Sequence, residues 1–135
     1  MAGGVYLSRD LLAKWRAGAT GPIRPIVVND HGVPDWADAG EVRVSGAPFR
    51  TPDADAQVAA VRQGIGMTRL PCFVGDADPL LARAPGIEPR LNGALWILTQ
   101  GEARKTKRVR LFTEFVSQRF AAYAPLLTGL SASGD

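Results

Sequence analysis

The sequence predicts an α/β fold in which a largely parallel sheet is layered with helices. Apolar or β-branched runs of strand length alternate along the chain with segments of helical periodicity, which is the pattern of this class. The 135 residues suffice for one domain with its own core. Hydrophobic residues make up 46% and charged residues 21% of the chain, which is an ordinary globular composition.

The first predicted elements are a strand and a short helix. Residues 5–7 are apolar and start the strand. Ser8 and Asp10 then offer side-chain oxygens that can cap a helix over residues 11–16. Gly18 follows at the position where a helix commonly ends in a left-handed residue.

Two further strands are predicted before the middle of the chain. Residues 26–28 are a β-branched run, Ile-Val-Val, which favours a strand. Residues 29–40 are polar and interrupted by glycine and proline, so we expect a loop. Residues 41–45 alternate polar and apolar side chains, as a half-exposed strand does.

The most regular segment begins at Thr51, a predicted N-cap with a proline behind it at the first helical position. The apolar residues of this helix lie on one face: Ala54, Val58, Val61 and Ile65. Gly64 is expected to end the helix with a positive φ, and Gly66 to allow a close backbone approach. A strand over residues 67–70 follows, and Pro71 stops it.

The pair Gly64 and Gly66 also matches the first two positions of the dinucleotide fingerprint G-x-G-x-x-G. The third position, however, is Arg69, and the predicted helix precedes the glycines instead of following them. A phosphate would therefore have no helix N-terminus to bind. We interpret these glycines as a structural turn between a helix and a strand.

The second half of the chain predicts a short helix within residues 72–81 and a brief strand over residues 81–84. Residues 94–99 form a continuous apolar run, which is typical of a strand buried on both faces, with Trp96 in the core. A last helix starts near Thr106 and ends at Pro125. Its apolar stripe has helical spacing: Val109, Phe112, Val116, Phe120 and Tyr123.

The composition also bears on the classes of function. No apolar run reaches the length of a membrane span and no signal peptide is evident, so we expect a cytoplasmic protein without a membrane partner. A lone His31 and a lone Cys72 cannot fill a zinc site or suggest a nucleophile pair. We expect no metal, no cofactor and no catalytic residue. The net charge of +3 is small, and the basic run over residues 104–110 is expected to be a solvated helix face.

The order of these elements resembles the effector-binding domain of LysR-type transcriptional regulators. Residues 51–71, TPDADAQVAAVRQGIGMTRLP, are similar to a capped helix of that family, with its G-x-G turn and a strand ending in Leu-Pro. The similarity continues through residues 72–79, 95–99 and 106–112. Residues 5–12 are similar to the segment by which these chains enter their second subdomain.

The resemblance, over roughly residues 5–123, implies a periplasmic-binding-protein-like fold of type 2 with two Rossmann-like subdomains. We expect an incomplete version of it. Residues 5–100 would form the second subdomain, residues 101–125 the return segment and C-terminal helix, and residues 126–135 a tail whose end, residues 131–135, is expected to fray. The winged helix-turn-helix of the family would precede Met1, so no direct DNA binding is expected from this chain.

The resemblance further implies a sensor that binds a small-molecule effector, such as a carboxylate, in a cleft between the subdomains to control transcription. Thr51 is a candidate ligand, because its hydroxyl and the free N–H groups of the next turn can receive an anion; a plain N-cap is the alternative. Thr68 and Arg69 lie on the strand that approaches the cleft. Since side chains alternate, we expect only one of them to face it, the alternative being a buried threonine or a solvated arginine.

The apolar stripe of the last helix is expected to pack on a first subdomain in this family. Without one, we expect the helix to fold back on its own sheet or to be covered by another chain, such as a second copy. This suggests a second hypothesis, a truncated interaction module that pairs with a full-length regulator. An enzyme is the third hypothesis and the least supported, because no cluster of nucleophile, base and stabilising group appears.

Overall fold

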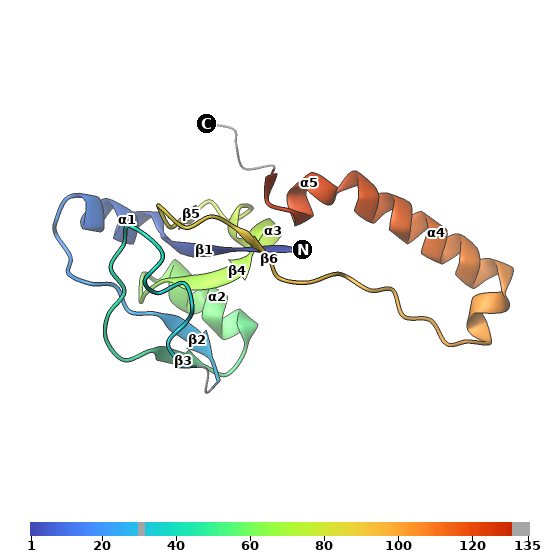
Figure 1. Cartoon of the computed structure of the whole chain (residues 1–135), viewed down its shortest axis with the longest axis horizontal. Helices are drawn as coiled ribbons and strands as arrows, with labels where there is room; N and C mark the ends of the chain where they lie inside the picture. The colour runs from blue at the N-terminus through green and yellow to red at the C-terminus, as the bar shows by residue number, and fades with distance from the viewer. Residues whose placement is uncertain (30–31, 131–135) are drawn as a thin grey trace.

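The computed structural model describes residues 1–29 and 32–130, which form a body and a long C-terminal arm (Figure 1). His31 and the predicted frayed end over residues 131–135 lie outside the described residues. The elements of the body are β1 (Ala2–Ser8), α1 (Arg9–Arg16), β2 (Ile26–Val28), β3 (Phe49–Thr51), α2 (Ala54–Arg62), β4 (Thr68–Pro71), α3 (Cys72–Gly75), β5 (Leu81–Arg83) and β6 (Arg90–Leu91). The C-terminal elements are the 3-10 turn η1 (Ala103–Lys105), α4 (Lys107–Ala122) and α5 (Ala124–Leu127).

Strand β1 lies at the centre of the larger sheet, in the order β4-β1-β5, and β6 pairs with its N-terminal end. All of these pairings are antiparallel. Strands β2 and β3 form a separate parallel pair, and a parallel bridge between Pro25 and Met67 joins this pair to the start of β4. There the Ile26 N–H donates to the Met67 carbonyl at 2.8 Å.

The α/β class is therefore confirmed, but the prediction of a largely parallel sheet is wrong for the larger sheet. Apolar runs predict strands without their direction, because direction depends on the connections between them. Strand β1 leads into α1, and the later strands β4 and β5 both return beside it in the opposite sense.

The two faces of β1 pack against two hydrophobic clusters. Val5 and Leu7 belong to one cluster, whereas Tyr6 points into the other, as the alternation of side chains in a strand requires. The first cluster also contains Leu12, Ile23, Trp36, Val42, Met67 and Ala84. The second contains Ile26, Ala60, Val61, Leu70 and Leu81. Because both faces are covered, β1 is buried along its whole length.

The N-cap of α1 agrees with the prediction, whereas the N-cap of α2 does not. Ser8 caps α1 as expected, since its hydroxyl accepts a hydrogen bond from the Leu11 N–H at 3.1 Å. The N-cap of α2 is Asp53, whose carboxylate accepts from the Ala56 N–H at 2.8 Å. The predicted N-cap Thr51 is wrong: this residue ends β3 opposite Val28. A residue before a proline favours extended backbone, so the helix starts later.

The short helix expected within residues 72–81 is present as α3, which ends at Gly75. Two other predicted elements differ in the structure. Residues 41–45 contain only an isolated bridge between Val44 and Ile23 instead of a strand. Residues 94–99 extend away from the body without secondary structure, and Trp96 is 80% exposed instead of being in the core (Figure 1). An apolar run becomes a buried strand only where neighbouring strands and a covering layer are present.

The arm, residues 94–123, consists of this extended segment, η1 and α4. Helix α4 does not fold back on the sheet, so that part of the prediction is wrong; Phe112, for example, is 63% exposed. Whether another chain covers it stays a prediction. The helix ends at Ala122, before Pro125, which lies at the start of α5. The predicted tail over residues 126–135 begins inside α5.

The C-terminal end of the described chain is attached to the body by a partly buried polar network. Asp76 accepts from the Tyr6 hydroxyl at 2.8 Å and from two nitrogens of Arg83, at 2.6 and 2.9 Å. The same guanidinium donates to the Gly129 carbonyl at 2.9 Å. Burial, aided by the bond to Asp76, raises the pKa of Tyr6 far above its usual range, so the phenol stays a proton donor. The arm therefore loops out between two attached ends.

No helix in residues 1–29 and 32–130 combines the length and the apolar character needed to cross a membrane.

Candidate functional site

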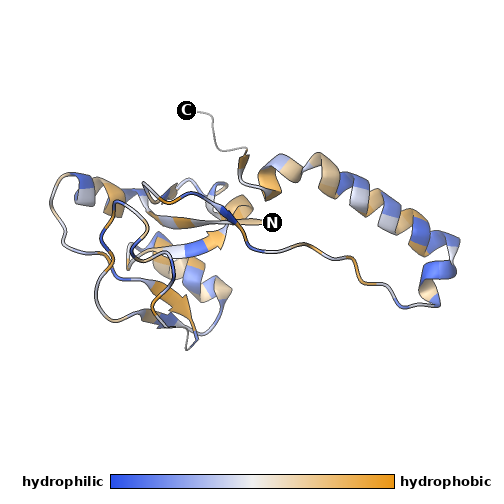
Figure 2. Ribbon diagram, in the orientation of Figure 1, coloured by the Kyte–Doolittle hydropathy of each residue, from blue (hydrophilic) through white to orange (hydrophobic). Residues whose placement is uncertain are grey.

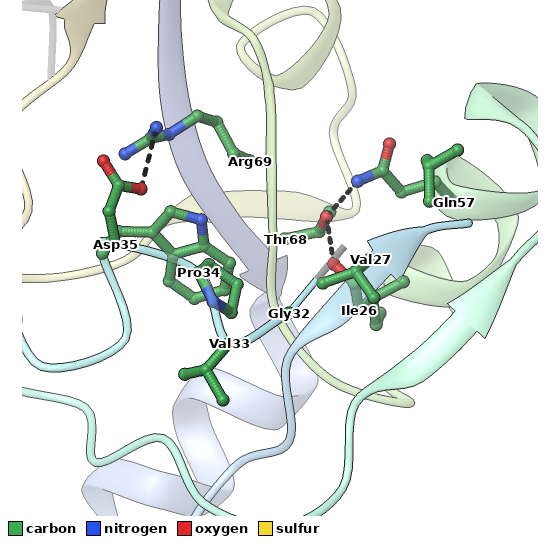
Figure 3. Close-up of a pocket in the computed structure, with 11 residues that line it drawn as sticks. Ile26, Val27, Gly32, Val33, Pro34, Asp35, Gln57, Thr68 and Arg69 are labelled. Atoms are coloured by element: carbon green, nitrogen blue, oxygen red, sulfur yellow. Dashed lines mark hydrogen bonds and ion pairs between the residues drawn. The ribbon is translucent and has the colours of Figure 1, made fainter. Parts of the chain in front are cut away.

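A cavity of about 400 Å³ lies where β2, α2 and β4 meet the loop that follows β2 (Figure 3). Its lining residues are Ile26, Val27, Val28, Gly32, Val33, Pro34, Asp35, Trp36, Gln57, Thr68 and Arg69. The wall is apolar over β2 and most of the loop, and polar side chains enter it from α2, from β4 and from Asp35 of the loop. The cavity occupies the junction at which the parallel strand pair joins the larger sheet.

Thr68 is the buried polar residue of this cavity. Its hydroxyl donates to the Ile26 carbonyl at 2.9 Å and accepts a hydrogen bond from the Gln57 side-chain amide. Figure 3 shows Gln57 and Ile26 on either side of Thr68. The hydroxyl proton is thus already in use, and the oxygen has at most one acceptor position left for a ligand. Thr68 is held in a fixed orientation.

Arg69 lies beside Thr68 and carries the positive charge of the cavity. Its terminal nitrogen Nη1 is 3.2 Å from a carboxylate oxygen of Asp35. Its Nε is buried and has no hydrogen-bond partner among the described residues. Buried donors in proteins are nearly always paired, so this unpaired nitrogen is unusual. Because it has almost no exposed surface, a ligand would reach Arg69 through the terminal nitrogens of its guanidinium.

Both Thr68 and Arg69 line this cavity, and the expectation that only one of them faces the effector cleft stays a prediction. Alternation along a strand separates the two side chains when both faces are covered evenly. Here the cavity lies at the end of β4, where the sheet is joined to β2 by a single bridge. The long side chain of Arg69 reaches the Asp35 loop from the neighbouring position (Figure 3).

Asp35 connects this loop to two strands. Besides Arg69 on β4, its second oxygen is 3.4 Å from Nη1 of Arg90 on β6. The Asp35 side chain is 61% exposed, so both ion pairs are screened by water. The next residue, Trp36, is buried in the first hydrophobic cluster and fixes the base of the loop.

Thr51 is not among the lining residues of this cavity. It is buried, and its hydroxyl donates to the Val27 carbonyl at 3.2 Å. The structure thus brings Thr68 and Arg69 together and leaves Thr51 behind β2, where it supports the strand that forms the cavity wall.

The predicted turn residues lie between α2 and α3. Gly64 has a φ of 72°, in the left-handed region. A Cβ on Gly66 would lie 2.2 Å from the Arg24 carbonyl oxygen, so only glycine allows this approach. Pro71 is the last residue of β4, opposite Gly3.

Asp35, Trp36 and Gln57 were not predicted as site residues. Asp35 and Trp36 lie in a segment that the sequence marks only as a loop, and Gln57 is a polar position on an amphipathic helix. No local pattern distinguishes them, because their role depends on contacts with residues far away in the chain, such as Arg69. Among the described residues, no three His, Cys, Asp or Glu side chains gather as a metal site would require.

The architecture is that of an α/β protein with a polar cavity at the junction of its sheets. The family model of the LysR substrate binding domain matches residues 25–121, which is most of the chain. The chain therefore belongs to the LysR substrate-binding domain family, whose fold is periplasmic-binding-protein-like. Neither the curated proteins nor the solved structures compared with this chain give a significant match.

Proposed function

We propose that this chain is the ligand-sensing part of a LysR-type transcriptional regulator and that a small-molecule effector binds in the cavity beside β4. The observation that carries the proposal is the meeting of Thr68, Arg69 and Gln57 in one apolar-walled cavity. Its volume of about 400 Å³ lies within the range of about 300–1,000 Å³ that small-molecule sites occupy. Membership of the substrate-binding family supports the same function.

In this proposal different residues of the cavity bind different parts of the effector. The apolar wall, including Ile26 and Trp36, takes the body of the effector. Arg69 attracts a negatively charged group such as a carboxylate, and Thr68 fixes the orientation of a neighbouring donor. Thr51 acts indirectly, because its bond to the Val27 carbonyl holds the β2 wall in place.

The proposal extends to the place of this chain in a regulator. Residues 5–100 correspond to the second subdomain of a type 2 binding fold, which is incomplete within this chain. The regulator works in the cytoplasm as an oligomer, and effector binding shifts the arrangement of its subunits to control transcription. This chain contacts the effector and not DNA, and it has no catalytic role.

The test is a screen of small metabolites, both carboxylates and neutral compounds, followed by the amide NMR spectrum of the labelled protein. We expect the shifts caused by a hit to centre on Gln57, Thr68 and Arg69. Replacing Arg69→Gln should weaken an anionic hit about tenfold or more, as expected for loss of a charge-assisted hydrogen bond. Arg43→Gln is the matched control, since Arg43 is exposed and is not among the lining residues. A screen without hits at these amides would contradict the proposal.

A second candidate function is favoured by the arm. Together with Met1 and the α5 region, it forms an apolar groove of about 470 Å³ lined by Met1, Leu95, Trp96, Ile97, Ser117, Phe120, Ala124, Leu127 and Thr128. Figure 2 shows apolar residues along both the extended segment and α4. Contiguous exposed apolar surface of this kind is typical of a protein interface. We propose that the arm pairs with a second copy or with a full-length regulator.

Light scattering after size-exclusion chromatography, over a range of protein concentrations, tests the second candidate. The wild-type chain should associate as its concentration rises, and Trp96→Ser combined with Phe120→Ser, two exposed residues that line the groove, should shift it toward monomer. Leu80→Ser is the control, because Leu80 is an exposed apolar residue on the body. A wild-type chain that stays monomeric at every concentration, and that does not bind a full-length regulator, would remove this candidate.

A further inference from the structure

We propose that Asp35 acts as an internal ligand of the cavity: its carboxylate occupies the place at Arg69 that the anionic group of the effector takes, and the effector binds by displacing it. This inference rests on the proposed function and specifies the ligand class, a small monoanion with an apolar body. It also assigns a selectivity role to a residue of the loop rather than of the strand.

The pairing between Asp35 and Arg69 is incomplete on the arginine side. One nitrogen, Nη1, is paired at 3.2 Å, while the buried Nε has no partner among the described residues. A guanidinium can donate to both oxygens of a carboxylate at once, and two parallel bonds of this kind are the stronger arrangement. An incoming carboxylate that pairs with both terminal nitrogens of Arg69 is therefore a better ligand than Asp35, which pairs with one of them.

The two carboxylates cannot share the site at low cost. Like charges within a few ångströms of each other repel, and the repulsion grows where the cavity excludes water. A bound anion at Arg69 therefore favours departure of Asp35. A neutral ligand gains nothing by removing Asp35 from Arg69.

Asp35 has a second partner, Arg90, with which it can stay paired after its carboxylate leaves Arg69. Its other oxygen is 3.4 Å from Nη1 of Arg90, whose side chain is as exposed as that of Asp35, at 61%. The departing carboxylate can therefore stay with Arg90 at the edge of the sheet. Since the next residue, Trp36, is buried in the first hydrophobic cluster, the exchange needs only a change in the Asp35 side chain.

The competition can be measured with benzoate and benzamide, two probes of the same shape that differ in charge. Both are titrated into the labelled wild-type protein and followed by the amide signals of Gln57, Thr68 and Arg69. Benzoate should bind and benzamide should bind much more weakly. Asp35→Asn should tighten benzoate binding by about 2- to 5-fold, the range expected when a competing exposed ion pair is removed. The same change should leave benzamide binding unaltered.

The matched control is Asp38→Asn, which removes the same charge from the same loop at an exposed position that does not line the cavity. It should leave benzoate binding unchanged, and Arg69→Gln should abolish it. The amide spectra of all variants report whether they remain folded.

Four results would overturn the inference: no benzoate binding to wild type or Asp35→Asn, equal binding of benzamide, no tightening by Asp35→Asn, or equal tightening by Asp38→Asn. If neutral metabolites from the wider screen bind at Thr68 while benzoate does not, the internal-ligand role fails and the sensing function stands. If no compound binds in the cavity, the sensing function itself fails.

Discussion

Gly66 occupies the point at which the chain leaves α2 and passes the backbone of Arg24. A Cβ at this position would lie 2.2 Å from the Arg24 carbonyl oxygen, a backbone atom that no rotamer change can move. The same carbonyl accepts a hydrogen bond from the Met67 N–H at 3.1 Å. The close approach therefore connects the β2 segment to β4, and with it the two sides of the cavity.

Replacing Gly66→Ala should lower the free energy of unfolding by about 2–3 kcal/mol, since one of the two backbones has to move. Urea denaturation measures this change. Gly21→Ala is the control, because a Cβ there meets nothing within 4 Å and the backbone φ is not in the left-handed region. Equal stability of the two variants would show that the close approach has no energetic consequence.

Arg69 shows what can and cannot be predicted from the sequence about a single residue. Its position on the strand after the G-x-G turn, together with the resemblance to LysR-type regulators, makes it a candidate from the sequence. Its partner Asp35 was not identified, because an ion pair between β4 and a distant loop leaves no local pattern. Long-range pairs of this kind depend on the tertiary structure.

Among the elements, α2 shows how neighbouring capping residues compete. Thr51 and Asp53 are both good N-cap types, and Pro52 lies between them. The pairing of Thr51 with Val28 keeps the chain extended up to the proline, so Asp53 takes the cap. The sequence predicted the helix itself correctly, and the strand pairing decided its first residue.

We expect Asp53→Ala to lower the free energy of unfolding by about 1 kcal/mol, because the Ala56 N–H loses its acceptor. Asp55→Ala is the control: Asp55 lies in the first turn without the capping bond, so only its smaller interaction with the helix dipole is lost. Thermal or urea unfolding of both variants gives the comparison. A larger loss for Asp55→Ala than for Asp53→Ala would contradict the assigned cap.

On the scale of the whole molecule, the arm is the feature that departs most from an ordinary globular domain. Its extended segment, residues 94–99, lies between β6 and η1 and is apolar yet exposed. None of its backbone N–H groups donates to a described residue. In contrast, β1 is paired along both edges and buried on both faces. The chain thus combines a well-packed body with an unpaired apolar segment.

Hydrogen exchange should separate these two regions. At low protein concentration the amides of residues 94–98 should exchange at nearly unprotected rates, and those of β1 on the order of 10³-fold more slowly, as expected for the core of a stable domain. Mass spectrometry of the exchanged peptides measures both. Protection of residues 94–98 that rises with concentration would indicate that another copy covers the arm. Protection equal to that of β1 in the dilute monomer would contradict the exposed arm.

The α/β class and the approximate positions of β1, α1, α2 and β4 could be predicted from local periodicity, capping residues and glycine placement. The family was predicted from the resemblance of the sequence to LysR-type regulators, and the match over residues 25–121 confirms it. The strand directions, the exposure of residues 94–99 and the pairing of Asp35 with Arg69 are known only from the folded structure. Each of these depends on which distant segments lie side by side. Hydrogen bonds and burial between distant segments cannot be predicted from the propensities of a few consecutive residues.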